Sequence, residues 1–207
     1  MIVLDFIDNM RQLGIFSDAD VEILFPNLDK RRLFEWKKKG YIIKIRNEWY
    51  CLPEFLEEPY SSWIIANLVH SPSYISLESA LNYYGLIPEG VYTTTSVTTK
   101  RPLRIEMARH NYSYSFFRTG LFGGYNLIEA ARYKRKIRIA DFEKAIVDFF
   151  YFRSGYNTVR TISELRFSEP VLRENLNSDR LFKYLDDFKN TELNSRVEKM
   201  LKIYYYA

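Results

Sequence analysis

The stretch Y-I-S-L-E-S-A-L-N-Y-Y-G-L-I-P-E, residues 74–89, gives the clearest local signal in this chain. It predicts the end of a strand followed by a short helix. Ser76 is a favourable N-cap residue, and the residues after it are compatible with a helix. Gly85 suits the left-handed position that ends a helix, and Pro88 prevents the helix from continuing.

The residues around this stretch predict a mixed α/β region with a helical end. Segment 91–99 is rich in threonine and valine, and segment 112–116 alternates aromatic residues with serine, which favours a strand with one buried face. Segment 133–139 predicts a further strand. Asp141 is expected to cap a helix over residues 142–152. Further helices are expected at 62–69, 172–176, 179–188 and 193–204.

The N-terminal residues predict three short helices followed by a β-hairpin. Apolar residues recur at helical spacing over 3–13, Ser17 is expected to cap a second helix, and Asn27 a third that ends near Lys39. The hairpin strands are expected at residues 41–45 and 49–52. This order is that of a winged helix-turn-helix, whose third helix enters the major groove of DNA while the hairpin contacts the backbone.

The expected fold class is therefore α+β, an N-terminal winged helix-turn-helix followed by a mixed α/β domain. A chain of 207 residues is long enough for two small domains. We expect them at residues 1–56 and 60–207, joined by the segment 53–59, which holds two prolines and three glutamates.

Basic residues are concentrated in two stretches, although the formal net charge is only +4. Residues 30–46 hold eight basic side chains against Glu35, and residues 100–138 hold ten basic side chains against two acidic ones. Residues 53–99 hold five acidic side chains and no basic one. This distribution predicts two separate anion-facing surfaces.

The first basic stretch is interpreted as a DNA-binding surface. Leu33 and Trp36 share one face of the third expected helix, and the basic side chains lie on the other. Phe34 falls on the basic side, where it either touches a thymine methyl group or packs against the hairpin or the second domain. Basic residues near a helix end also favour the helix dipole and solubility, which is the alternative explanation. The expected DNA-binding residues are Lys30, Arg31, Lys37, Lys38, Lys44 and Arg46.

The second basic stretch predicts a cationic surface on the larger domain. Four of its side chains, at alternate positions from 132 to 138, would share one face of a strand. The alternative is a solvated face, or ion pairs with the acidic residues after position 138. The residues of this expected surface are Arg101, Arg104, Arg118, Arg132, Lys134, Lys136 and Arg138.

No motif in the sequence indicates an enzyme, a metal site or a cofactor. His70 and His110 have no Cys or acidic residue at ligand spacing and are interpreted as loop residues. Cys51 is expected to be a buried strand residue. Gly120, Gly123 and Gly124 are interpreted as turn glycines, since no G-K-[ST] follows them. Four acidic residues are the best candidates for a catalytic carboxylate, but they are expected to have structural roles: Glu78, Glu89, Glu143 and Asp148.

The composition also indicates the cellular compartment of the protein. A single cysteine excludes an internal disulfide and favours a reducing cytoplasm. The first five residues lack the basic start of a secretory signal, and no apolar run approaches the ~20 residues of a membrane span. A cytoplasmic protein without a membrane partner is therefore expected.

Four segments together resemble the AbiEi-type antitoxins, the antidote halves of bacterial type IV toxin–antitoxin (abortive-infection) systems. The segments are residues 74–89, T-S-V-T-T-K-R at 95–101, L-F-G-G-Y at 121–125 and I-A-D-F-E-K-A-I-V-D at 139–148. The family usually has proline where this chain has Phe142, and either residue can occupy the first helical position.

The resemblance implies an antitoxin that opposes a nucleotidyltransferase-like toxin through its C-terminal domain and represses its own operon through the N-terminal winged helix. It implies that a stable complex with the toxin is not required. Repressors of this kind work as dimers or as cooperating monomers on operator DNA. Two other classes stay open: a winged-helix transcriptional regulator without a toxin partner, and an RNA-binding protein that stacks bases on its tyrosines.

Overall fold

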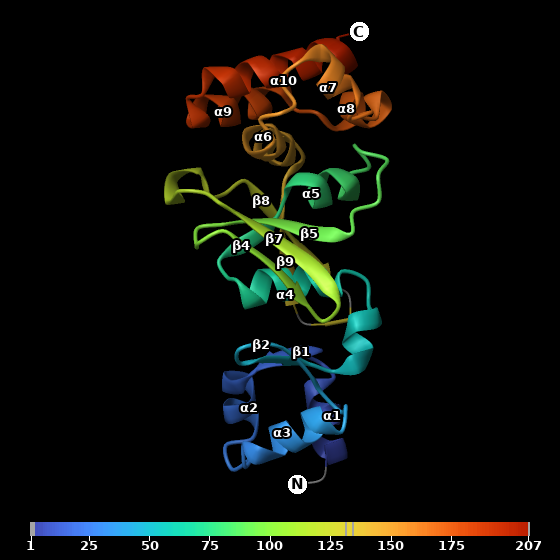
Figure 1. Cartoon of the computed structure of the whole chain (residues 1–207), viewed down its shortest axis with the longest axis vertical. Helices are drawn as coiled ribbons and strands as arrows, with labels where there is room; N and C mark the ends of the chain where they lie inside the picture. Colours follow the sequence, from blue (N-terminus) through green and yellow to red (C-terminus); the bar gives the residue numbers. More distant parts are fainter. Residues whose placement is uncertain (1–2, 131, 134, 207) are drawn as a thin grey trace.

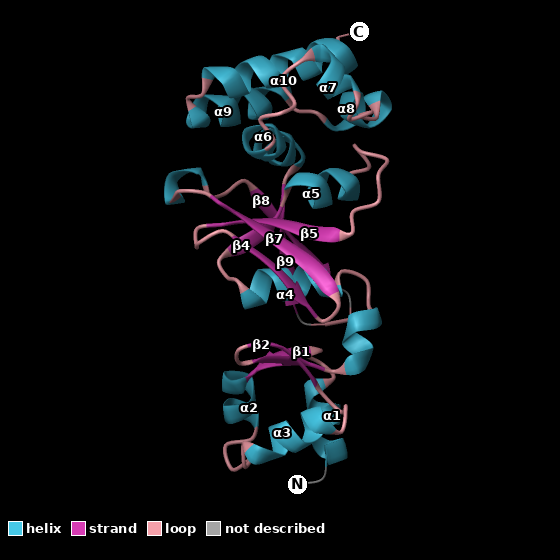
Figure 2. Ribbon diagram, in the orientation of Figure 1, coloured by secondary structure: helices cyan, strands magenta, loops and turns pink. Residues whose placement is uncertain are grey.

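Two β-sheets, one of three strands and one of six, organise the chain into an N-terminal and a larger part (Figures 1 and 2). The computed structural model describes residues 3–130, 132–133 and 135–206. The strand order is β1-β3-β2 in the small sheet and β6-β7-β5-β4-β9-β8 in the large one. The expected mixed α+β class is confirmed.

The described residues of the N-terminal part form three helices and three strands. Its elements are α1 (Val3–Met10), β1 (Ile15–Ser17), α2 (Asp18–Leu24), α3 (Arg31–Lys38), β2 (Ile43–Arg46) and β3 (Trp49–Cys51). Ser17 caps α2 as expected, in a capping box with Asp20. Strand β1 was not expected from the sequence, because three residues are too few to show a period of two.

The third helix begins later than the sequence predicts. Asn27 does not cap it; α3 starts after Lys30, and the backbone N–H of Arg31 donates to the carboxylate of Asp29 at 2.9 Å. Both Asn27 and Asp29 are favourable cap residues, and the chain uses the later one to satisfy an N–H of the first turn. The helix ends as expected before Gly40, whose φ is +77°.

The N-terminal part has its own apolar core but also shares an interface with the larger part. Phe6 lies at the centre of this core, and its ring packs against those of Phe16 and Trp36. The opposite side of the small sheet contributes Ile15 and Ile45 to the core of the larger part. The two parts therefore bury apolar surface against each other.

The segment that joins the two parts is ordered and packed. It forms a 3₁₀ helix, η1 (Pro53–Glu57), in which Phe55 is fully buried. The Phe55 ring centroid lies 5.0 Å from that of Tyr133 in the larger part. This contact, together with the shared core, fixes the segment against the larger part.

The larger sheet is mixed, with parallel and antiparallel pairs. Its strands are β4 (Ser73–Ile75), β5 (Thr93–Thr98), β6 (Leu103–Met107), β7 (His110–Phe116), β8 (Tyr125–Ala130) and β9 (Arg135–Ala140). One face of the sheet is covered by α4 (Ser61–Val69), and the Tyr114 hydroxyl of β7 donates to the Ala66 carbonyl of α4 at 3.1 Å. Tyr112 is buried on the same face, as expected. Phe116 was expected there too, but it ends β7 and is 49% exposed.

Helices cover the other face of the sheet (Figure 1). α5 (Leu77–Tyr83) and α6 (Phe142–Phe152) lie on the sheet, and the four helices that follow α6 in the chain form a layer beyond it. Asp141 caps α6 by accepting from the Lys144 N–H at 2.8 Å, and the bounds of α6 are those expected from the sequence. The outer helices are α7 (Val159–Ser163), α8 (Glu169–Asn175), α9 (Ser178–Phe188) and α10 (Thr191–Tyr204).

Among residues 3–130, 132–133 and 135–206, none of the helices has both the length and the apolar composition that a membrane crossing requires.

Candidate functional site

The exposed face of α3 stands at one end of the molecule, on the side of the N-terminal part that points away from the large sheet (Figure 1). Leu33 and Trp36 are buried in the core, as their spacing predicts. Four of the expected DNA-binding residues are exposed on or next to this helix: Lys30, Arg31, Lys37 and Lys38. The rest of the molecule leaves this face accessible.

Lys44 of β2 joins this face. Lys30, Lys37 and Lys44 line one cavity of about 170 Å³ between α3 and the small sheet. The Lys37 ammonium lies 5.1 Å from the ring centroid of Phe34, which is 63% exposed. Phe34 therefore does not pack against the hairpin or the larger part. It stays in solvent beside a cation.

Arg46 is on the same strand as Lys44 but does not line this cavity. It is half-buried, and its charge acts on two residues of the larger part, His70 and Tyr114. The pKa of His70 is lowered chiefly by burial and further by Lys100 and Arg46. The end of the hairpin that carries Arg46 thus faces the larger part, because the small sheet packs against the larger part.

The structure does not gather the second expected surface on one strand face. Strand β9 begins at Arg135, so among the described residues of this set only Lys136 and Arg138 share a strand face. Arg132 lies in the preceding turn and pairs with Glu58 of the joining segment. Lys134 lies outside the described residues. The expectation of four aligned cations on one strand is therefore wrong.

The remaining cations of that expected surface lie near the ends of β5 and β7 and the start of β6, away from β9. Arg104 lies on the edge strand β6, four strand spacings from β9, which corresponds to about 19 Å. Arg101 and Arg118 are exposed in the segments that follow β5 and β7. The described cations of the expected set therefore do not form one surface with Lys136 and Arg138 of β9.

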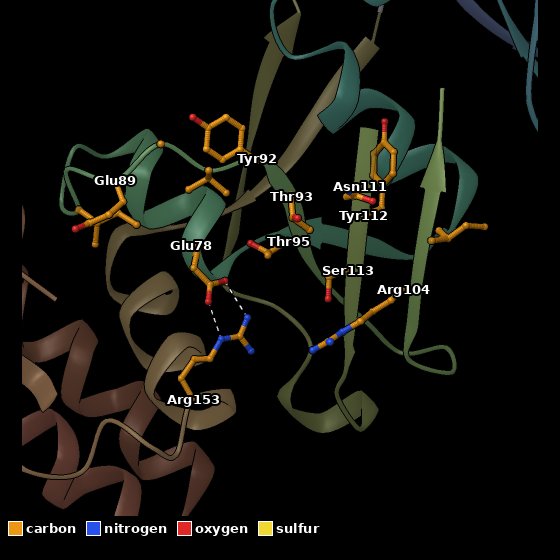
Figure 3. Close-up of a pocket in the computed structure, with 14 residues that line it drawn as sticks. Glu78, Glu89, Tyr92, Thr93, Thr95, Arg104, Asn111, Tyr112, Ser113 and Arg153 are labelled. Carbon is orange, nitrogen blue, oxygen red and sulfur yellow. Dashed lines mark hydrogen bonds and ion pairs between the residues drawn. The ribbon is translucent and has the colours of Figure 1, made fainter. Parts of the chain in front are cut away.

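A groove opens instead over the polar half of the large sheet (Figure 3). It comprises two adjoining cavities of about 570 Å³ and 450 Å³, which share Arg104, Ser113 and Arg153. Its floor is made by side chains that neighbour one another across β5, β7 and β6. Thr93 pairs with Asn111, Thr95 with Ser113, and Ser113 with Arg104.

Two ion pairs involve acidic residues that line the groove. The Arg153 guanidinium donates to both carboxylate oxygens of Glu78, at 2.6 and 2.9 Å (Figure 3). This pair ties the end of α6 to α5, and its bidentate geometry is the strong form of such a bond. Glu89 pairs with Arg166, whose hydrogen bond holds the Glu89 pKa below its usual value.

Most groove residues were not singled out from the sequence. Arg153 follows α6 and belongs to no sequence motif. Asn111 and Ser113 lie on a strand whose sequence pattern predicts a buried face but no binding site. The alternation of aromatic residues with serine in 112–116 was the available signal. Because side chains alternate between the two faces of a strand, this pattern places the tyrosines on the face that α4 covers and the serines on the polar face that forms the floor of the groove.

A second polar cluster is buried beneath α6. The Lys144 ammonium donates to the Tyr74 hydroxyl at 3.1 Å and to the carboxylate of Asp148. Asp148 also accepts from Tyr74 at 2.9 Å and from Ser76 at 2.8 Å. Burial raises the Asp148 pKa, and these three partners act in the opposite direction. Ser76 thus uses its hydroxyl here, and forms no side-chain cap on α5.

Each of the four acidic residues expected to be structural forms an ion pair with a basic side chain. Glu143 is buried, where it accepts from the Asn177 N–H at 2.7 Å and pairs with Arg180 at 3.4 Å. The Asp148 pair with Lys144, four residues earlier, agrees with the expected spacing.

Cys51 is a buried strand residue, as expected, and burial followed by the charge of Glu54 raises its pKa to about 12. A thiol held in its neutral form is a poor nucleophile.

His70 directly follows α4, and its Nε2 lies 3.1 Å from the Arg101 carbonyl oxygen. His110 was expected in a loop but is the first residue of β7, and its Nε2 lies 2.8 Å from the Thr94 hydroxyl. In the part of the chain that the structure describes, His, Cys, Asp and Glu form no group of three or more suited to a metal ion.

No protein-family model matches this chain, and no curated protein is similar to it.

Proposed function

We propose that this chain is an antitoxin of the AbiEi type, which binds operator DNA through α3 and opposes a nucleotidyltransferase-like toxin through its larger part. The observation that carries the proposal is the exposed cationic face of α3 at the free end of the molecule. Cations held in register on a helix are what a phosphate backbone requires.

The fold proposed for the N-terminal part is a winged helix-turn-helix. The order helix, strand, helix, helix and hairpin supports it, and α2 and α3 would form the helix-turn-helix. In this proposal Lys30, Lys37 and Lys44 contact phosphates. Arg46 is left out of the contact surface, because it lies at the interface with the larger part.

DNA binding is tested by removing charge from α3 in the full chain. The variant carries four substitutions: Lys30→Ala, Arg31→Ala, Lys37→Ala and Lys38→Ala. Binding to a duplex from its own promoter should weaken. The slope of log affinity against log salt should also fall, by about one for each phosphate that the variant no longer neutralises.

A matched control removes the same charge from the layer of outer helices through Arg160→Ala, Lys183→Ala, Lys189→Ala and Lys202→Ala, of which Lys189 directly follows α9. This control should keep the salt slope of the native chain, since those residues lie beyond α6. An unchanged slope in the folded α3 variant would place the DNA contact elsewhere. Competition by single-stranded RNA better than by duplex DNA would favour the RNA-binding alternative.

Antitoxin activity is tested by co-expression with the neighbouring gene while growth is followed. Both the native chain and the α3 variant should restore growth to toxin-arrested cells, because the activity is assigned to the larger part. A folded native chain that never restores growth would overturn the assignment.

A winged-helix regulator without a toxin partner is the second candidate. The groove on the large sheet favours it, because its volume is that of a small-molecule site. Such a regulator would change its affinity for DNA when a ligand fills the groove. The absence of a nucleotidyltransferase-like reading frame beside this gene would support this candidate over the first.

A further inference from the structure

The groove on the large sheet has the dimensions of a ligand site. Its larger cavity measures about 570 Å³ and continues into a second cavity of about 450 Å³. Sites for small organic molecules and cofactors have volumes of roughly 300–1,000 Å³. Strands β5, β7 and β6 form the floor, so the groove is built on rigid backbone rather than on a loop.

The charges in the groove leave one cation without a counter-charge. Glu78 is neutralised by Arg153, and Glu89 by Arg166. The Arg104 guanidinium has no ion pair or hydrogen bond with any residue that the structure describes, and Figure 3 shows this side chain crossing the floor toward Arg153. A guanidinium with free N–H groups in a groove is suited to a phosphate or carboxylate.

The floor next to Arg104 presents unused polar groups. Within the described parts of the chain, the side chains of Thr93, Asn111 and Ser113 have no hydrogen-bond partner, although each faces the cavity. Thr95, by contrast, donates to the Ser76 carbonyl at 2.7 Å and is occupied. Two hydroxyls and an amide in adjacent positions can both donate to and accept from the hydroxyl groups of a sugar.

The end of the groove away from Arg104 is apolar and aromatic. Ile87, Val91 and Tyr92 form its wall, and Tyr92 is 88% exposed. An exposed tyrosine beside apolar side chains is a surface on which a planar ring can stack.

We propose that the groove binds a nucleoside that carries one phosphate group. The phosphate pairs with Arg104 and Ser113, the sugar lies over Thr93 and Asn111, and the base stacks against Val91 and Tyr92. The site belongs to the larger part and is independent of the DNA contact assigned to α3. It therefore gives the protein a small-molecule ligand in addition to its proposed nucleic-acid partner.

Calorimetric titration of the full chain tests the ligand class. The probes are the four ribonucleoside 5′-monophosphates, the corresponding 3′,5′-cyclic monophosphates, the nucleosides and ribose 5-phosphate. At least one phosphorylated nucleoside should bind at least tenfold more tightly than both its nucleoside and ribose 5-phosphate. The two phosphate series distinguish a monoester from a diester ligand.

Variants assign the binding to the groove. Arg104→Gln should weaken binding about tenfold or more, since it removes a charged hydrogen bond. Arg118→Gln, another exposed arginine of the larger part, should leave it unchanged. Ser113→Tyr should fill the floor and abolish binding while thermal unfolding shows that the variant is folded. The α3 charge variant should keep full affinity for the nucleotide, which separates this test from that of DNA binding.

Three results would overturn the proposal. The first is that no phosphorylated nucleoside binds at millimolar concentration. The second is that a nucleoside binds as tightly as its phosphate, which would remove the role of Arg104. The third is that ribose 5-phosphate binds as tightly as the nucleotides, which would remove the role of the aromatic wall.

Discussion

The ammonium group of Lys144 lies 3.1 Å from the hydroxyl oxygen of Tyr74, a residue 70 positions earlier in the chain. Asp148 accepts from both groups, and the three side chains are almost completely shielded from water. Tyr74 and Lys144 belong to residues 74–89 and 139–148, two of the four segments on which the proposed antitoxin assignment rests. Those segments therefore meet at one buried polar cluster, which connects β4 to α6.

This cluster predicts a large effect of removing its cation. Lys144→Met leaves the carboxylate of Asp148 buried without a charge partner, which should lower the free energy of unfolding by about 3–5 kcal/mol. Urea denaturation followed by circular dichroism measures the change.

Adding Asp148→Asn to that variant should recover part of the loss, because the amide oxygen still accepts from Tyr74 and Ser76 while no charge is buried. A double variant less stable than Lys144→Met would contradict the assigned role of the charge.

A side chain at Gly124 is predicted to destabilise the fold through both backbone strain and a steric clash. Its φ is +71°, and an added Cβ would lie 2.6 Å from the hydroxyl oxygen of Tyr184. Gly124→Ala should therefore destabilise the fold by about 1–3 kcal/mol more than a left-handed alanine alone does.

Gly85 provides the matched control, since its φ is +69° but no atom lies within 4 Å of an added Cβ. Gly85→Ala should cost only about 1–2 kcal/mol, the backbone contribution. Equal melting temperatures for the two alanine variants would show that Tyr184 moves aside.

The interface between the two parts predicts a strong effect at Phe55. Its side chain is fully buried against Tyr133, so Phe55→Ala should lower the free energy of unfolding by about 3–5 kcal/mol. The same substitution at Phe34, which is 63% exposed, should change it by less than about 0.5 kcal/mol.

Limited proteolysis gives an independent measurement at the same interface. The Phe55→Ala variant should be cleaved in the joining segment 53–59 faster than the native chain. Resistance equal to that of the native chain would mean that the small sheet holds the parts together without Phe55.

The two histidines predict a fall in stability at acid pH. The pKa values of His70 and His110 are both lowered, in each chiefly by burial. The unfolded chain therefore binds more protons than the folded chain as the pH falls through about 6.5. The free energy of unfolding should be highest above that pH and should decrease between pH 7.5 and 5.

Thermal unfolding of the His70→Asn, His110→Asn double variant checks this assignment. Its melting temperature should vary less over the same pH range than that of the native chain. Carboxylates titrate in both proteins, so the difference between the two profiles reports the histidines. Parallel profiles would assign the pH dependence to other groups.

The sequence by itself determined the features that depend on near neighbours. The bounds of α6, its Asp141 cap, the Ser17 cap of α2 and the division of α3 into a buried and a cationic face all follow from residues within a few positions of one another. Helix periodicity and capping act over three or four residues, so a linear pattern contains them.

Only the tertiary structure decided which cations share a surface. Arg46 and Arg132 were grouped with nearby basic residues, but they lie where the small sheet and the joining segment pack against the larger part. Arg104 and Arg153, far apart in sequence, line one groove because β6 lies at the edge of the sheet next to β7, with the end of α6 above it. Strand order and interdomain packing depend on contacts between distant residues, and spacing along the chain does not encode those contacts.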